Sequence, residues 1–133
     1  MTDISPKKFL LNILIVEDEI INQLILKKAL ENLGCNVRVA QDGNEAIKLL
    51  QENYFELVFM DIQIPFIDGL EVTKRLRLGK TGKLNKNTPV FAYTALAGTV
   101  DKKVYMEAGM GGCLTKPFHL EDVVSLLNME VLV

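Results

Sequence analysis

Charged and hydroxyl side chains follow several apolar runs of the sequence, each at the point where a run ends. The set consists of Glu17, Asp18, Asp61, Thr94 and Lys116. Each of these residues alone is ordinary, because an acidic pair before a helix is commonly a cap and an aspartate after a strand is commonly a turn residue. Their recurrence at the ends of separate runs indicates one shared site.

The residue types of this set favour phosphoryl transfer to an aspartate. Three carboxylates within several ångströms repel one another, and a hard dication such as Mg²⁺ relieves that repulsion. One carboxylate can then act as a nucleophile towards a phosphoryl group. The metal and the ammonium would neutralise the equatorial phosphoryl oxygens, and the hydroxyl could donate a hydrogen bond to one of them.

The elements that position these residues alternate along the chain. Short apolar runs predict strands at 13–16, 36–40, 56–60, 89–93 and 112–115. Stretches with helical spacing predict helices at 20–33, 44–52, 70–78, 99–108 and 120–128. The first helix carries a broad apolar stripe of Ile21, Leu24, Ile25, Leu26, Ala29, Leu30 and Leu33.

Strands that alternate with helices predict an α/β fold, specifically a flavodoxin-like, doubly wound, five-stranded parallel sheet with five helices. The continuous apolar runs suit strands that are buried on both faces. The chain has 133 residues and shows no internal repeat or linker, so we expect one domain over 1–133 with its core at about 12–128. In such a fold the ligand site lies beyond the carboxyl ends of the strands.

The composition argues against several partners. The formal net charge is −2, with 15 basic and 17 acidic residues, so nucleic acid is not expected as a partner. No apolar run approaches the 18 residues of a membrane span, and segment 1–8 is polar, so no membrane contact is expected. Cys35 and Cys113 are far apart and form no metal-binding pair, which favours a reducing, cytoplasmic location.

Four stretches resemble the receiver domain of two-component response regulators, and they occur in the same order over about 12–127. They are ILIVEDE at 13–19, MDIQIPFIDG at 60–69, YTA at 93–95 and LTKPF at 114–118. Asn22, Gln23 and the stretch TPVFAYTA at 88–95 are most similar to receivers attached to hybrid histidine kinases.

The resemblance implies a role for each matching residue of the acidic site. Asp61 would be the phosphoacceptor. Asp18 would bind Mg²⁺ (or Mn²⁺) directly, and Glu17 would bind it through water. The backbone carbonyl of Gln63 would complete the metal ligands from the protein.

The resemblance also implies roles for the two remaining members of the set. Thr94 would be the switch hydroxyl, and Lys116 would bind the phosphoryl group. The peptide bond between Lys116 and Pro117 would be cis.

By the same resemblance, the phosphodonor would be a sensor histidine kinase or a histidine phosphotransfer domain. The chain would not be a turnover enzyme, although it would catalyse its own aspartyl phosphorylation and dephosphorylation. The downstream partner stays open. The polar N-terminal segment favours a stand-alone receiver over a piece of a hybrid kinase.

Two positions depart from the receiver pattern. Cys113 stands where the family usually has a Tyr or Phe that turns with the switch, and Leu96 stands where a polar side chain is frequent. A cysteine is too small to transmit the motion of an aromatic ring. We therefore expect the change on phosphorylation to be carried by the backbone of 95–101 and the helix after it.

Three other functions stay open at this point. A phosphohydrolase with an aspartyl nucleophile usually has a second Asp two residues after the first, where this chain has Gln63. A flavin- or corrinoid-binding module would need a phosphate-cradling loop after the first strand or a His two residues after Asp61. A receiver that no longer signals by phosphate is the third, although all five key positions are filled.

Overall fold

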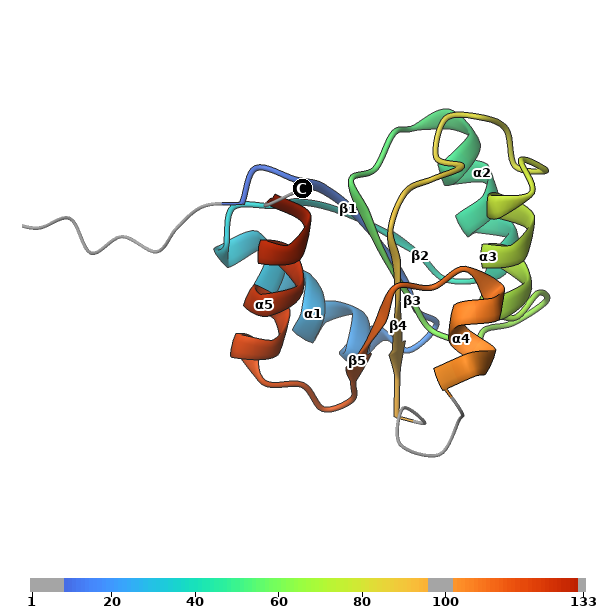
Figure 1. Cartoon of the computed structure of the whole chain (residues 1–133). Helices are drawn as coiled ribbons and strands as arrows, with labels where there is room; N and C mark the ends of the chain where they lie inside the picture. The colour runs from blue at the N-terminus through green and yellow to red at the C-terminus, as the bar shows by residue number, and fades with distance from the viewer. Residues whose placement is uncertain (1–8, 96–101, 132–133) are drawn as a thin grey trace, which may run out of the picture.

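The computed structural model describes residues 9–95 and 102–131, and these form a parallel sheet covered by helices on both faces (Figure 1). The strands are β1 Asn12–Val16, β2 Asn36–Ala40, β3 Leu57–Met60, β4 Val90–Thr94 and β5 Gly112–Thr115. The helices are α1 Ile20–Asn32, α2 Gly43–Glu52, α3 Gly69–Arg77, α4 Lys102–Ala108 and α5 Leu120–Val131. These agree closely with the predicted elements, and the part of the helix predicted before 102 lies outside the described residues. Among the described residues, none of the helices combines the length and apolar character that crossing a membrane requires.

The strand order is β2-β1-β3-β4-β5, and each neighbouring pair is parallel. The predicted flavodoxin-like, doubly wound fold is therefore confirmed. The chain moves from β1 outwards to β2, then returns to β3 on the other side of β1. This reversal makes the carboxyl ends of β1 and β3 the switch point, where open α/β sheets bind ligands.

Both faces of the sheet are packed, because successive strand residues point to opposite sides. Ile13 and Ile15 join a cluster with Leu26 and Leu30 of α1 and with side chains of α5. Leu14 and its alternate neighbours join a second cluster with α2, α3 and α4. Figure 1 shows the same division, with α1 and α5 on one side and the other three helices opposite. The continuous apolar runs of the sequence follow from this two-sided burial.

Helix α1 differs from its prediction in which apolar residues it buries. Leu26 and Leu30 are fully buried against the sheet, as predicted. Ile21, Leu24 and Ile25, which the predicted stripe included, have exposed fractions of 71%, 57% and 52%, so that part of the prediction is wrong. At about 100° per residue, these three lie on a different face of α1 from the buried leucines. Helix α1 therefore presents an apolar surface to solvent.

The start of α3 is held tightly under the end of β3. A Cβ atom added to Gly69 would lie 2.2 Å from the carbonyl oxygen of Asp61 and 2.7 Å from Cγ of Met60. The amide of Gly69 donates to the Ile62 carbonyl at 2.9 Å, and Asp68 caps α3 by accepting from the Glu71 amide at 2.8 Å. The backbone that carries Asp61 is therefore fixed by a close approach that only glycine allows.

We expect Gly69→Ala to lower the free energy of unfolding by about 1–3 kcal/mol, because the methyl group forces the start of α3 away from Asp61. Urea unfolding followed by circular dichroism measures this change. The matched control is Gly111→Ala, whose added Cβ would meet only Cε1 of Phe91 at an ordinary 3.5 Å. Equal losses in the two variants would contradict the tight packing at Gly69.

Candidate functional site

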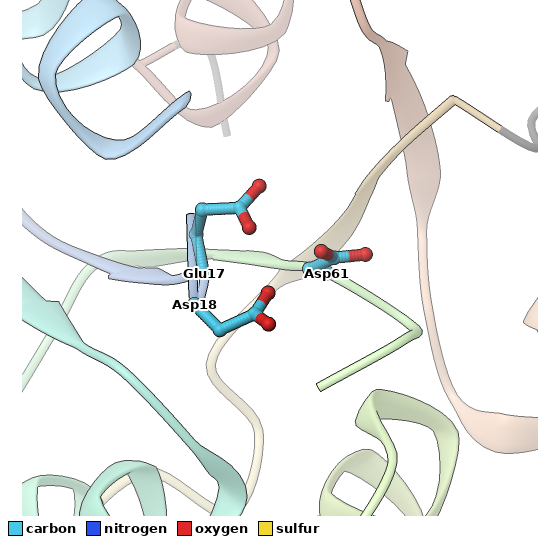
Figure 2. A group of neighbouring side chains, drawn as sticks. All are labelled: Glu17, Asp18 and Asp61. Atoms are coloured by element: carbon cyan, nitrogen blue, oxygen red, sulfur yellow. The ribbon is translucent and has the colours of Figure 1, made fainter. Parts of the chain in front are cut away.

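Two strand ends bring three carboxylates together. The amide of Asp61 donates to the Val16 carbonyl at 2.9 Å, so the chain after β3 runs beside the chain after β1. Figure 2 shows Glu17 and Asp18 following β1, with Asp61 across from them. One carboxylate oxygen from each of the three residues lies within 4.8 Å of the others. Backbone pairing between the strands, rather than any attraction between the side chains, produces this cluster.

The three carboxylates are not equivalent. Glu17 is fully buried and Asp61 has an exposed fraction of 6%, whereas Asp18 is exposed. Both oxygens of Glu17 already accept hydrogen bonds, one from the Lys116 ammonium and one from the Glu19 amide at 3.0 Å. Asp18 and Asp61 are therefore the better placed of the three to contact a metal directly, and Glu17 is better placed to act through water.

Lys116, which directly follows β5, brings a positive charge to the cluster. Its Nζ lies 2.9 Å from Oδ2 of Asp61 and also donates to Oε1 of Glu17. The same Nζ lies 4.7 Å from the ring centroid of Tyr93, within the range of a cation–π contact. The lysine side chain is thus held over an aromatic ring with its charge aimed at the carboxylates. Its bond to Pro117 is cis, as predicted.

The electrostatics of the cluster follow from burial. Burial raises the pKa of Glu17 from 4.5 to about 7, and the charge of Asp61 adds to this rise, while the hydrogen bond from Lys116 opposes it. Burial also disfavours the charge on Lys116, but its hydrogen bonds to Glu17 and Asp61 outweigh that effect and raise its pKa. Lys116 therefore stays charged, and its ammonium contacts two of the three acidic groups, Glu17 and Asp61.

This donor set fits a hard divalent cation. Mg²⁺ prefers a few carboxylate oxygens, together with water and phosphate oxygens, and a protein supplies only one or two of them directly. The cluster offers the exposed Asp18 and the nearly buried Asp61 on one rim. Added positive charge would also relieve the repulsion that Lys116 alone does not cancel.

Thr94 and Gln63 are joined to residues of the cluster by backbone hydrogen bonds, while their predicted roles, as switch hydroxyl and as a metal ligand through its carbonyl, stay predictions. Thr94 is the last residue of β4 and is buried, and its carbonyl accepts from the Lys116 amide at 3.2 Å. The amide of Gln63 donates to Oδ1 of Asp61 at 3.2 Å. The predicted site residues therefore gather at one edge of the sheet. Leu96, where the sequence departs from the receiver pattern, lies outside the described residues.

The sequence reasoning missed two residues that support the site. Tyr93 lies under Lys116, and its hydroxyl donates to the Asn22 carbonyl at 3.1 Å, which joins β4 to α1. Gln23 donates from Nε2 to the Glu17 carbonyl at 2.6 Å. The sequence signal for Tyr93 is its place directly before Thr94, at the end of a strand that leads into the site. The spacing of Gln23 in the sequence does not reveal its hydrogen bond to Glu17, which depends on the direction in which α1 leaves the end of β1.

The family model for the response regulator receiver domain matches residues 13–128 of this chain. A hybrid signal transduction histidine kinase K from Dictyostelium discoideum is 37% identical over 90% of this chain, and the sensor histidine kinase RcsC from Escherichia coli is 34% identical over 88% of it. The matches cover only 10% and 12% of those two relatives. The chain belongs to the response regulator receiver domain family, whose members are signalling modules of two-component phosphorelays. Its likeness to receivers of histidine kinases is confirmed.

Two solved structures extend this comparison. The magnesium-bound receiver domain of a sensor histidine kinase from Pseudomonas aeruginosa superimposes with a TM-score of 0.83 at 28% identity, covering 93% of this chain and 99% of that one. The receiver domain of Ssk1 from Saccharomyces cerevisiae, solved with the histidine phosphotransfer protein Ypd1, gives 0.76 at 31% identity, covering 94% and 89%. The first of these, together with the acidic cluster, supports magnesium binding by this chain.

We expect the metal-free protein to lose stability as the pH rises. The folded state holds the Glu17 proton more tightly than the unfolded state, so this contribution is complete below the unfolded pKa of 4.5 and is lost as the pH passes 7. In the presence of a chelator, the free energy of unfolding should fall by about 2 kcal/mol from this group between pH 5 and 8. Chemical denaturation at each pH measures it.

The matched variant is Glu17→Gln, which keeps the shape of the side chain and removes the titration. Its stability should fall less between pH 5 and 8 than that of the wild type. An identical fall in the two proteins would mean that Glu17 does not hold a raised pKa.

Proposed function

We propose that Asp61 accepts a phosphoryl group from a phosphohistidine donor, with a divalent metal held beside it by Asp18, Asp61 and, through water, Glu17. The single observation that carries this proposal is the convergence of three carboxylates within 4.8 Å around an ammonium that lies 2.9 Å from Asp61. The backbone carbonyl of Gln63 is the further protein ligand in this proposal. Mg²⁺ is the metal we assign, and Mn²⁺ would satisfy the same oxygen ligands.

In this reaction a carboxylate oxygen of Asp61 attacks the phosphorus atom, and the bond between phosphorus and the donor's imidazole nitrogen breaks. Bound metal would neutralise charge on the transferring oxygens. Lys116 supplies a second positive charge, and it already contacts the nucleophilic carboxyl group. Residues Glu17 and Gln63 orient the site, because Glu17 holds Lys116 and the Gln63 amide holds Oδ1 of Asp61.

The response to phosphorylation would begin at Thr94 and Lys116. A new phosphoryl oxygen attracts the Thr94 hydroxyl and the Lys116 ammonium through charge-assisted hydrogen bonds. Because the Thr94 carbonyl accepts from the Lys116 amide, the ends of β4 and β5 would move together. The chain thus acts as a phosphorelay receiver and switches partner binding. It catalyses its own phosphorylation and dephosphorylation rather than the turnover of a separate substrate.

The donor is a sensor histidine kinase or a histidine phosphotransfer domain. A groove of about 350 Å³ adjoins the site and is lined by Asn22, Ile25, Tyr93, Ala95 and the segment 116–118. This groove connects Lys116 to the exposed apolar face of α1, where Ile21 and Leu24 lie. Such a surface suits a protein donor that covers the site during transfer.

Two further assignments, the bounds of the domain and its location in the cell, also belong to this proposal. We assign 1–133 to one receiver domain, in which the family model covers 13–128. A cytoplasmic location is supported by the two cysteines, Cys35 and Cys113, which are both free thiols.

We expect acetyl phosphate with Mg²⁺ to phosphorylate wild-type protein at Asp61 and to leave Asp61→Asn unlabelled, because an amide oxygen is a poor nucleophile. Borohydride trapping followed by mass spectrometry locates the modified residue. Asp122→Asn changes an exposed aspartate in the first turn of α5 that is not part of the acidic cluster, so it is the matched control and should be labelled like the wild type. Undiminished labelling of Asp61→Asn would refute Asp61 as the phosphoacceptor.

We expect Mg²⁺ to stabilise the folded protein through the same cluster. A ligand at 100 times its dissociation constant contributes about 2.7 kcal/mol. Asp18→Ala should lose most of this gain, since the exposed Asp18 carboxylate is the one most open to the metal. Thermal unfolding with and without Mg²⁺ measures the gain, with Asp122→Ala as the control. The metal site would be misassigned if Asp18→Ala and the wild type gained equally.

A further inference from the structure

Phe66 forms the tip of a strained turn between β3 and α3. Its φ is +72°, and it is the one described residue other than glycine with a positive φ. The amide of Ile67 donates to the Pro65 carbonyl at 2.9 Å, so Phe66 is the central residue of a three-residue γ-turn. The γ-turn with positive φ is the rarer and more strained of the two types, and a bulky side chain in this region of φ is a genuine outlier.

The turn itself does not depend on a phenylalanine. The Pro65 carbonyl also accepts from the Gly43 amide at 3.4 Å, and Gly69 closes the far end of the loop on the Ile62 carbonyl. Residues on either side of Phe66 therefore determine the path of the chain. Glycine or asparagine would adopt this conformation with less strain.

Burial of the Phe66 side chain does not offset the backbone strain. Its exposed fraction is 80%, and Phe66 belongs to neither core cluster. An aromatic side chain that is both strained and exposed is unfavourable in the isolated fold. Backbone strain of this kind is concentrated at functional sites, where a binding event makes use of the residue.

The position of Phe66 near Asp61 indicates that the binding event is the docking of the phosphoryl donor. It lies five residues after Asp61, on the loop that packs against the start of α2, whereas the exposed Ile20 and Ile21 lie on the other flank at the start of α1. Asp61 itself has an exposed fraction of only 6%. A phosphohistidine must therefore come close to the surface around Asp61, and Phe66 and the start of α1 are exposed parts of that surface.

We propose that Phe66 is an anchor for a histidine phosphotransfer protein, the class of partner with which the similar receiver of Ssk1 was solved, and that it inserts into an apolar pocket beside the phosphohistidine of that donor. This inference rests on the proposed function, since it assumes transfer to Asp61. Aromatic side chains that become buried near the centre of an interface are frequent hot spots of binding energy. A small donor such as acetyl phosphate has no surface that could contact Phe66, so it distinguishes docking from chemistry.

The test compares Phe66→Asn with the wild type, using phosphorylated Ypd1 as the protein donor and acetyl phosphate as the small donor. Transfer from Ypd1 should slow by about tenfold, the scale of losing one hot-spot contact. Labelling by acetyl phosphate should stay unchanged. The melting temperature should rise by about 2–4 °C, because asparagine tolerates a positive φ. Loss of transfer together with a gain of stability is a combination that a merely structural residue does not give.

Two further variants sharpen the comparison. Phe66→Tyr keeps the ring and should retain transfer from Ypd1. Leu78→Asn removes another exposed apolar side chain, with an exposed fraction of 68%, at the far end of α3, and should change neither transfer nor labelling. Unchanged transfer from Ypd1 to Phe66→Asn, or a lowered melting temperature, would overturn the anchor.

The outcomes also separate this inference from the proposed function. If the wild type is labelled by acetyl phosphate but receives nothing from Ypd1, a phosphotransfer protein is rejected as the occupant and the anchor falls with it, while Asp61 stands. If acetyl phosphate labels no residue of the wild type, the proposed function itself is wrong.

Discussion

Negative charge is concentrated where β1 and β3 end, and the surrounding packing prevents it from dispersing. Glu17 is fully buried and Asp61 nearly so, so water solvates these two carboxyl groups poorly. Burial raises the pKa of Glu17 to about 7, and the contact with Lys116 compensates only part of the unfavourable charge. A site of this kind favours any ligand that brings positive charge, which is the physical basis for assigning a metal to it.

The close approach of these carboxylates is imposed by the backbone. The Glu17 amide donates to the Ala40 carbonyl and the Asp61 amide donates to the Val16 carbonyl, each at 2.9 Å, so both chains leave the sheet in register. Gly69 then holds the chain after Asp61 against α3. Since two core clusters pack the strands from both sides, the site cannot relax by separating its strands. The free energy of packing in the two core clusters therefore outweighs the repulsion between the carboxylates.

The same arrangement gives the site a means of response. Lys116 has two carboxylate partners, and a phosphoryl group on Asp61 would change the balance between them. A phosphoryl group shifts the populations of the inactive and active conformations only by the difference between its interaction free energies with the two. Cys113 packs, half-buried, against the cluster that contains Tyr105, whose hydroxyl has no hydrogen-bond partner among the described residues. The packing between Cys113 and Tyr105 thus leaves a buried polar group unpaired, whereas both carboxylate oxygens of Glu17 in the acidic site accept hydrogen bonds.

The order of strands and helices, the parallel sheet and the site at its edge were predictable from the sequence, because apolar periodicity and strand-end residues are local signals. Which apolar residues of α1 face the core was not, since α1 carries apolar residues on both faces and only the packing shows that Leu26 is buried and Ile21 is exposed. Nor was the role of Asn85, which is buried in the loop before β4 and bonds the carbonyls of Leu50 and Asn53. Tertiary structure also decided that Glu17 is buried while its neighbour Asp18 is exposed. Burial and pKa depend on what the rest of the chain packs around a residue, and local spacing carries no information about that.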